Sequence, residues 1–196
     1  MRIIGGKCGG QLLRAPKGLD VRPTPDLVRQ AIFNSLGARV IDSVVLELFG
    51  GTGALSLECL SRGAKNAICI ELSPRHSKII KENFLSLGLP KESYKVITHD
   101  VYSILPVFVS EGLTFDLIFA DPPFGEKTKG ERSRSHSQKL LDNPYLPKLL
   151  KPDGLFCLGH TKRDVVEVTA MWTEVKSLKH GDSVFKFLKV AAGGTE

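Results

Sequence analysis

The sequence lacks long apolar runs and clustered metal-ligating residues. None of its 196 residues belongs to an apolar stretch of 18, so no membrane-spanning helix is predicted. The opening segment Met1–Lys7 lacks the apolar core of a signal peptide, and we expect a soluble cytoplasmic protein. The four cysteines form no C-x-x-C pair and the five histidines show no metal-ligand spacing. No metal site and no redox chemistry are therefore predicted.

The strict G-x-G-x-x-G fingerprint of dinucleotide-binding proteins is also missing. Instead, the apolar run 44–49 leads into Gly50-Gly51-Thr52-Gly53, and apolar residues at near-helical spacing follow until Arg62-Gly63. Glycines between a strand and a helix let the backbone approach a ligand at the helix N-terminus. A second predicted strand ends at Glu71, 21 positions after Gly50, a distance that suits a carboxylate binding ribose hydroxyls.

The acid Glu47 lies just before the glycine-rich loop. A carboxylate at this position would repel a pyrophosphate, but it suits a cofactor that carries an ammonium group and a sulfonium. The charge therefore favours S-adenosylmethionine over NAD. A glycine-rich turn that binds neither cofactor is the alternative.

A reactive tetrapeptide, Asp121-Pro122-Pro123-Phe124, follows the predicted strand 115–120. Open α/β sheets carry their chemistry at the carboxyl ends of the strands. Each proline fixes φ and removes an N–H donor, so backbone carbonyls can point at a ligand, and the aromatic ring offers a stacking face. An ordinary turn that ends a strand is the alternative interpretation.

Positive charge is unevenly distributed along the chain, whose net charge is +6. Residues 1–40 carry seven basic and two acidic residues, and residues 125–139 carry five basic and two acidic ones. Two basic stretches that flank one predicted site favour a nucleic-acid backbone as partner, although solvated surface charge is the alternative. The candidate RNA-binding residues are Arg2, Lys7, Arg14, Arg22, Lys127, Lys129, Arg132 and Arg134.

Strands alternate with helices along most of the chain, which predicts a mostly parallel sheet. Thr24 is the expected N-cap of a helix that runs to about Leu36, with Val28, Ala31 and Ile32 facing inward. Further helices are expected after the glycine-rich loop and over 74–87, 101–109 and 138–150. Strands are expected at 44–49, 66–71, 94–98, 115–120 and 154–159, followed by an antiparallel pair at 173–178 and 184–190.

Length and composition fit a single globular unit, with 42% hydrophobic and 24% charged residues. We expect an N-terminal β-hairpin arm over residues 1–21, in which Ile3-Ile4 and Leu12-Leu13 form the strands. The main α/β domain is expected over residues 22–190, and a disordered tail over 191–196.

The whole pattern resembles the Rossmann-like class I S-adenosylmethionine-dependent methyltransferases. More narrowly, residues 2–190 resemble the bacterial small-subunit (16S) ribosomal RNA guanine-N2 methyltransferase family. The tetrapeptide alone is shared with DNA adenine and protein glutamine methyltransferases, so the N-terminal segment narrows the choice. The motifs that carry the resemblance are Arg2-Ile3-Ile4-Gly5-Gly6, Arg22-Pro23-Thr24, Val28-Arg29, Phe33-Asn34, 49–55, Ser61-Arg62-Gly63-Ala64 and Asp121-Pro122-Pro123-Phe124.

The resemblance implies a role for each matching residue. Thr24, Glu47, Phe49, Gly50, Gly51, Thr52 and Gly53 would line the methionine part of the cofactor. Glu71 would bind the ribose, Leu72 the adenine ring, and Asp100 and Val101 the adenine amino edge, while Asp121, Pro122, Pro123 and Phe124 would hold the target base. The chain departs from the family at Gly9-Gly10-Gln11, where a basic pair is usual, and at Gly159-His160, where an acid is usual.

The chemistry of the tetrapeptide can be argued without the resemblance. The lone pair of an exocyclic guanine amine is delocalised into the ring, so the amine is a poor nucleophile. If Asp121 and the Pro122 carbonyl accept its two N–H hydrogens, the lone pair turns toward the sulfonium methyl group. The same geometry would serve adenine N6 in DNA or a glutamine N5 amide in protein. A non-catalytic RNA-binding factor for ribosome assembly is the third hypothesis.

Overall fold

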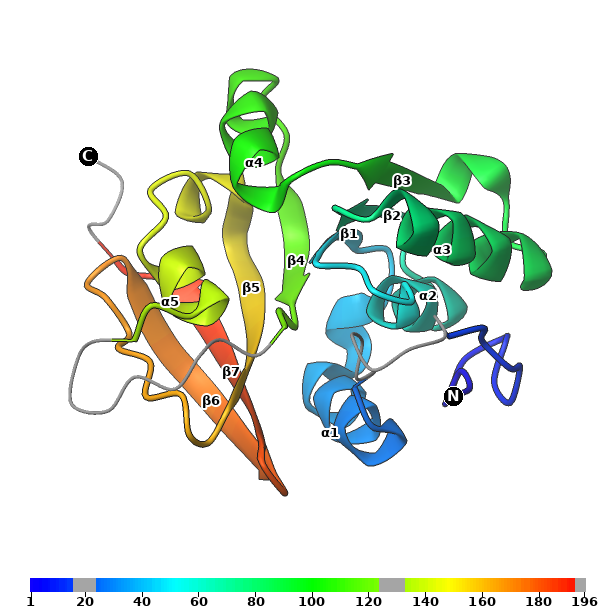
Figure 1. Ribbon diagram of the computed structural model, residues 1–196, viewed down its shortest axis with the longest axis horizontal. Helices are drawn as coiled ribbons and strands as arrows, with labels where there is room; N and C mark the ends of the chain where they lie inside the picture. Colours follow the sequence, from blue (N-terminus) through cyan, green and yellow to red (C-terminus); the bar gives the residue numbers. More distant parts are fainter. Residues whose placement is uncertain (16–23, 124–132, 193–196) are drawn as a thin grey trace.

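The computed structural model describes residues 1–15, 24–123 and 133–192, which form a seven-stranded mixed sheet between two layers of helices (Figure 1). The strands are β1 (Val44–Leu48), β2 (Asn66–Glu71), β3 (Tyr94–Thr98), β4 (Phe115–Ala120), β5 (Leu150–Thr161), β6 (Trp172–His180) and β7 (Ser183–Val190). The α-helices are α1 (Asp26–Leu36), α2 (Ala54–Ser61), α3 (Pro74–Ser86), α4 (Val101–Ser110) and α5 (His136–Leu141).

The strand order is β3-β2-β1-β4-β5-β7-β6. The first five strands in this order pair in parallel, and β7 pairs antiparallel with both β5 and β6. The predicted fold class, a mostly parallel seven-stranded sheet with a C-terminal antiparallel hairpin, is confirmed. The chain proceeds outward from β1 to β3 and then returns to β4 on the other side of β1, so the strand order reverses between β1 and β4.

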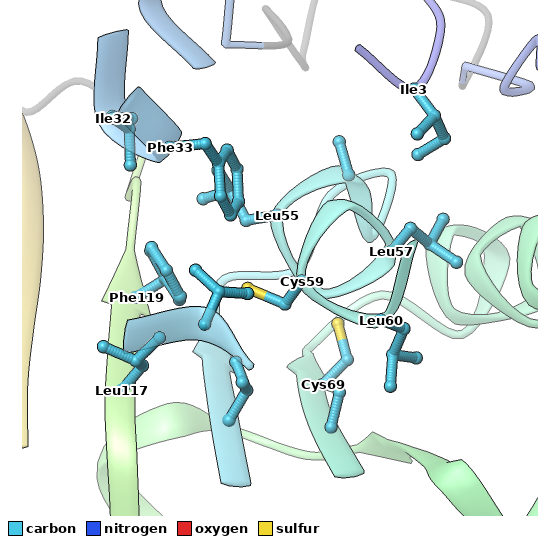
Figure 2. Close-up of a cluster of buried hydrophobic side chains, with 14 of the residues drawn as sticks. Ile3, Ile32, Phe33, Leu55, Leu57, Cys59, Leu60, Cys69, Leu117 and Phe119 are labelled. Atoms are coloured by element: carbon cyan, nitrogen blue, oxygen red, sulfur yellow. The ribbon is translucent and has the colours of Figure 1, made fainter. Parts of the chain in front are cut away.

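Each face of the sheet carries its own apolar core. On one face, α1, α2 and α3 pack against the strands, and on the other face α4 and α5 do so. Figure 2 shows the first core, in which Phe33 of α1 lies 6.1 Å from Phe119 of β4 between ring centroids. These apolar contacts hold the helices against the sheet and so fix the carboxyl ends of the central strands.

The N-terminal arm covers the outer side of α2, whose eight residues are all buried. The Glu58 carboxylate of α2 accepts hydrogen bonds from the backbone N–H groups of Ile4 and Gly5, at 2.8 and 2.9 Å. In residues 1–15 the predicted hairpin is reduced to one antiparallel bridge between Arg2 and Leu12, flanked by backbone hydrogen bonds from Ile3 N to Gln11 O and from Leu13 N to Met1 O. The arm is therefore held both by α2 and by this short antiparallel pairing of its own.

Two helix predictions need correction. Helix α1 begins at Asp26 after Pro25, and no side chain caps it, so Thr24 is not the N-cap. Helix α5 ends at Leu141, well before the predicted end at residue 150. Prolines at 144 and 147 explain this early end, because proline lacks the N–H that a continuing helix requires.

The predicted domain boundary at residues 21 and 22 lies outside the described residues, as do residues 193–196 of the predicted tail. The proposed division of the chain thus stays a prediction. In the part of the chain that the structure describes, no helix is both long and apolar enough to cross a membrane.

Candidate functional site

The candidate site lies at the carboxyl ends of β2, β1 and β4, where the strand order reverses. Leu48 of β1 pairs with Ile70 of β2 on one side and with Ala120 of β4 on the other. The residues that follow these three strands therefore leave the sheet at the same level. Open α/β sheets bind their ligands at such a reversal.

The glycine-rich loop and Glu71 are joined directly. One Glu71 oxygen accepts a hydrogen bond from the Gly51 N–H at 2.8 Å, and the other accepts one from the Ser73 N–H at 2.8 Å. Each carboxylate oxygen can accept a second bond, so the buried Glu71 keeps the capacity to bind hydroxyl groups. His76 Nδ1 lies 3.6 Å from the same carboxylate.

The loop glycines are required by packing and by backbone conformation. A Cβ on Gly50 would lie 2.3 Å from Cys69 Sγ, and a Cβ on Gly53 would lie 2.8 Å from a methyl carbon of Ile80. Gly51 has φ of +57°, which glycine adopts without strain. Phe49 also has a positive φ, +58°, an uncommon conformation for an aromatic residue.

Glu47 plays a part that the sequence reasoning missed. Helix α2 starts after Gly53, which has no side chain to cap it, and the two Glu47 oxygens accept hydrogen bonds from Leu55 N and Ser56 N instead. Burial raises the pKa of this carboxyl to about 7, against the lowering effect of those hydrogen bonds. Glu47 therefore caps the N-terminus of α2 in place of an N-cap side chain. Its predicted contact with a cofactor stays a prediction, and both of its oxygens already have protein partners.

The residues predicted to contact adenine follow β2 and β3. Leu72 is 65% exposed and offers an apolar surface beside Glu71. One Asp100 oxygen caps α4 by accepting hydrogen bonds from the N–H and the hydroxyl of Ser103, both at 2.9 Å. Val101 is buried under this cap. The three residues lie at the same edge as the glycine-rich loop.

Asp121 is the first residue after β4, and its carboxyl group lies between Thr24, which precedes α1, and Gly159 of β5. The Thr24 hydroxyl donates a hydrogen bond to Asp121 Oδ2 at 2.5 Å. A Cβ on Gly159 of β5 would lie 2.4 Å from Asp121 Oδ1 and 2.8 Å from the ring of Phe185. Burial raises the pKa of Asp121 to about 6, and the Thr24 hydrogen bond opposes this rise. Gly159, noted above as a departure from the family, is thus the residue that leaves room for the carboxyl.

The rest of the tetrapeptide divides into a buried and an exposed residue. Pro122 is buried and Pro123 is exposed. The predicted stacking residue Phe124 lies outside the described residues. The described part of the tetrapeptide thus follows β4 at the level where the glycine-rich loop follows β1, since Ala120 pairs with Leu48.

An aromatic cluster beside the loop was not predicted. The Phe49 ring lies 5.3 Å from the His136 ring and 6.2 Å from the Tyr102 ring, between centroids. The Tyr102 oxygen lies 2.9 Å from His136 Nδ1. Burial, followed by the charge of Lys139, lowers the pKa of His136. No local sequence pattern indicates this cluster, because Phe49 follows β1, Tyr102 lies in α4 and His136 lies in α5.

The predicted RNA-binding residues fall into two groups. Arg22, Lys127, Lys129 and Arg132 lie outside the described residues, and the others lie on the surface. All four of these are exposed; Arg2 lies 3.7 Å from the Asp26 carboxylate, and Arg14 lies 2.8 Å from Glu82.

The four cysteines are free and buried, and Cys59, Cys69 and Cys157 have pKa values raised by burial. Among the described residues, no group of three His, Cys, Asp or Glu side chains is arranged to hold a metal ion. The thiols therefore act as small apolar side chains.

Residues 1–189 match the model of the family described as Conserved hypothetical protein 95. The chain belongs to this family. "Ribosomal RNA small subunit methyltransferase D" of Escherichia coli (strain K12) is 36% identical over 124 residues, which are 63% of this chain and 60% of that protein. The alignment thus spans less than two thirds of that relative.

Two other matches cover most of this chain and most of the matched protein. The protein of the same name from Haemophilus influenzae is 34% identical over 181 residues, 92% of this chain and 89% of that protein. A solved structure described as "Putative methyltransferase yhhF from Escherichia coli" has a TM-score of 0.78 and 28% identity, and covers 98% of both chains. The fold is that of class I methyltransferases.

Proposed function

We propose that this chain transfers a methyl group from S-adenosylmethionine to the exocyclic N2 amine of a guanine in small-subunit (16S) ribosomal RNA. The observation that carries the proposal is the position of Asp121, which leaves β4 beside the glycine-rich loop that leaves β1. A proton-accepting carboxylate and a candidate cofactor loop thus share the reversal point of the sheet. The names of the two relatives, both small-subunit ribosomal RNA methyltransferases, supply the substrate class.

The residues at this edge fit the proposed cofactor. Glu71 is fixed by Gly51 N and Ser73 N, so its remaining lone pairs can accept the ribose hydroxyls without any rearrangement. The exposed face of Leu72 suits the flat adenine ring, and Asp100 keeps one oxygen that takes no part in the α4 cap. When bound, the cofactor supplies the methyl group on a sulfonium.

Asp121 and Pro122 suit the acceptor amine. A carboxylate oxygen and a backbone carbonyl can each accept one N–H hydrogen, which draws the nitrogen toward tetrahedral geometry and directs its lone pair away from the ring. With its pKa near 6, Asp121 is mostly ionised above pH 7 and can act as this acceptor. Positioning and electrostatics would then provide the catalysis.

The exposed basic residues support an RNA substrate. Lys7 and Arg134 come from segments far apart in the sequence, and both are exposed. Phosphate contacts from such side chains supply much of the affinity for nucleic acid. A single guanine must also leave its helix, or already be unpaired, for its amine to reach Asp121.

Labelled methyl transfer tests the proposal. The full chain and labelled S-adenosylmethionine are incubated with small ribosomal subunits that lack the modification, with naked ribosomal RNA, with DNA and with protein. Nuclease digestion and mass spectrometry then identify the product. We expect N2-methylguanosine from the ribosomal RNA. Label in DNA adenine or in a protein amide would support S-adenosylmethionine as the cofactor but refute ribosomal RNA as the substrate. Binding of the cofactor and the RNA without methyl transfer would support a non-catalytic factor.

A further inference from the structure

Thr24 is joined to the reactive carboxyl although the two residues are 97 positions apart. Its hydroxyl donates a hydrogen bond to Asp121 Oδ2. Hydrogen bonds to an ionised carboxylate are stronger than neutral ones. The hydroxyl therefore fixes one oxygen of Asp121 and leaves that oxygen a further lone pair for a substrate N–H.

Thr24 is itself held by a buried arginine. Arg29 of α1 has no exposed surface, and its Nη1 donates to the Thr24 carbonyl oxygen at 2.8 Å. Its Nη2 donates to the carbonyl oxygen of Arg2 and, at 3.1 Å, to the Asp26 carboxylate. One guanidinium thus ties the N-terminal arm, the start of α1 and the backbone of Thr24 together.

We propose that Thr24 is a positioning residue for the acceptor carboxylate, and that Arg29 holds it in place. This inference rests on the proposed function for its catalytic consequence. It differs from the cofactor contact that the family resemblance implies for Thr24. It also explains why a short segment before α1, with no capping bond of its own, lies against the tip of β4.

The other groups around Asp121 do not account for its ionisation. Gly159 of β5 lies against the carboxyl, Phe185 of β7 lies beside Gly159, and neither titrates. On β5, His160 points Nδ1 at the carbonyl oxygens of Thr161 and Asp164, and burial lowers its pKa. On β1, Glu47 directs its carboxylate to α2, and on β7, Lys186 pairs with Glu174. The hydroxyl of Thr24 is the described group that stabilises the charged form.

The test compares Thr24→Val, which keeps the shape and removes the hydroxyl, with Thr24→Ser, which restores it. Thr24→Ala is a second variant without the hydroxyl, and Thr173→Val on the exposed face of β6 is the matched control. The full-length protein is labelled with ¹³C-aspartate, and the Asp121 carboxyl signal, assigned by its absence in Asp121→Asn, is titrated by NMR. Cofactor affinity is measured by calorimetry.

We expect Thr24→Val and Thr24→Ala to raise the midpoint of the Asp121 titration by about one pH unit, since each removes a bond to the charged form. Methyl transfer should then fall about five-fold at pH 6 but by only about a tenth at pH 8, while cofactor affinity stays within about two-fold. Thr24→Ser should restore the wild-type midpoint, and Thr173→Val should not move it.

Three results would overturn the inference. The first is an unchanged Asp121 titration midpoint in Thr24→Val. The second is a midpoint shift in Thr24→Ser as large as that in Thr24→Val. The third is a large loss of cofactor affinity in Thr24→Val with the pH dependence of methyl transfer below pH 7 unchanged. The last result would make Thr24 a cofactor ligand. Failure of the proposed function is a separate result, seen when the wild-type protein methylates no RNA. The NMR titration needs no methyl transfer and decides the Thr24–Asp121 contact in either case.

Discussion

Replacing Glu47 with glutamine should change how the stability of the protein depends on pH. Burial raises the pKa of this carboxyl from 4.5 to about 7. The folded protein therefore binds a proton that the unfolded chain has released between pH 4.5 and 7, and stability falls as the pH rises through this window. The charge that Glu47 carries above pH 7 is thus the destabilising form.

The magnitude follows from the two pKa values. A shift of 2.5 units corresponds to about 3.4 kcal/mol when the group is fully ionised, and about 2.5 kcal/mol of this develops between pH 5 and 8. Glutamine carries no charge at any of these pH values, yet its oxygen can still accept from Ser56 N. The free energy of unfolding of Glu47→Gln should therefore rise relative to wild type by about 2.5 kcal/mol over this range.

Urea unfolding of both proteins at pH 5, 6, 7 and 8 measures this difference. Every other titrating group, including Asp121, is common to the two proteins and cancels when the curves are subtracted. If the unfolding free energies of wild type and Glu47→Gln change in parallel from pH 5 to pH 8, the raised pKa of Glu47 is wrong.

Three further changes test other parts of the site. Glu71→Gln should weaken S-adenosylmethionine binding by at least about ten-fold in calorimetry, since it removes a charged acceptor for the ribose; unchanged affinity would remove Glu71 from the site. Gly53→Ala should lower the unfolding free energy by about 2 to 4 kcal/mol, because the φ of Gly53 is +73° and the Ile80 side chain of α3 occupies the place of a Cβ. The control Gly181→Ala also has a positive φ but no neighbouring atom, so it should lower the unfolding free energy by only about 1 kcal/mol. Lys7→Ala should reduce the salt slope of RNA binding by about one, whereas Lys148→Ala, an exposed lysine just before β5, should leave it unchanged; equal slopes in both variants would argue against an RNA contact at the arm.

The strands could be predicted closely because apolar runs and turn residues delimit them locally. The bounds of β2, β3 and β4 match the predictions residue for residue. Helix α5 was overextended because its apolar periodicity continues past Leu141, while the prolines at 144 and 147 stop it. A rule that gave these prolines more weight than periodicity would have found the correct end.

The sequence indicated which candidate residues stand at the ends of the strands, but not the partners of these residues. The loop, Glu71 and Asp121 follow predicted strands, so topology alone brings them to one edge. The contact between Thr24 and Asp121 joins residues that no local pattern relates. For Glu47 a signal did exist, because Gly53 offers the next helix no cap and a nearby acid is a natural substitute.

The Asp121→Ala variant tests the central claim most directly. Methyl transfer to small-subunit RNA and S-adenosylmethionine affinity are measured on the same preparation, with Asp42→Asn, an exposed acid before β1, as the matched control. The account predicts a loss of transfer of at least about a hundred-fold in Asp121→Ala, with affinity nearly unchanged, because the carboxylate acts on the acceptor amine and not on the cofactor. Transfer at the wild-type rate, or a large loss of affinity, would contradict it.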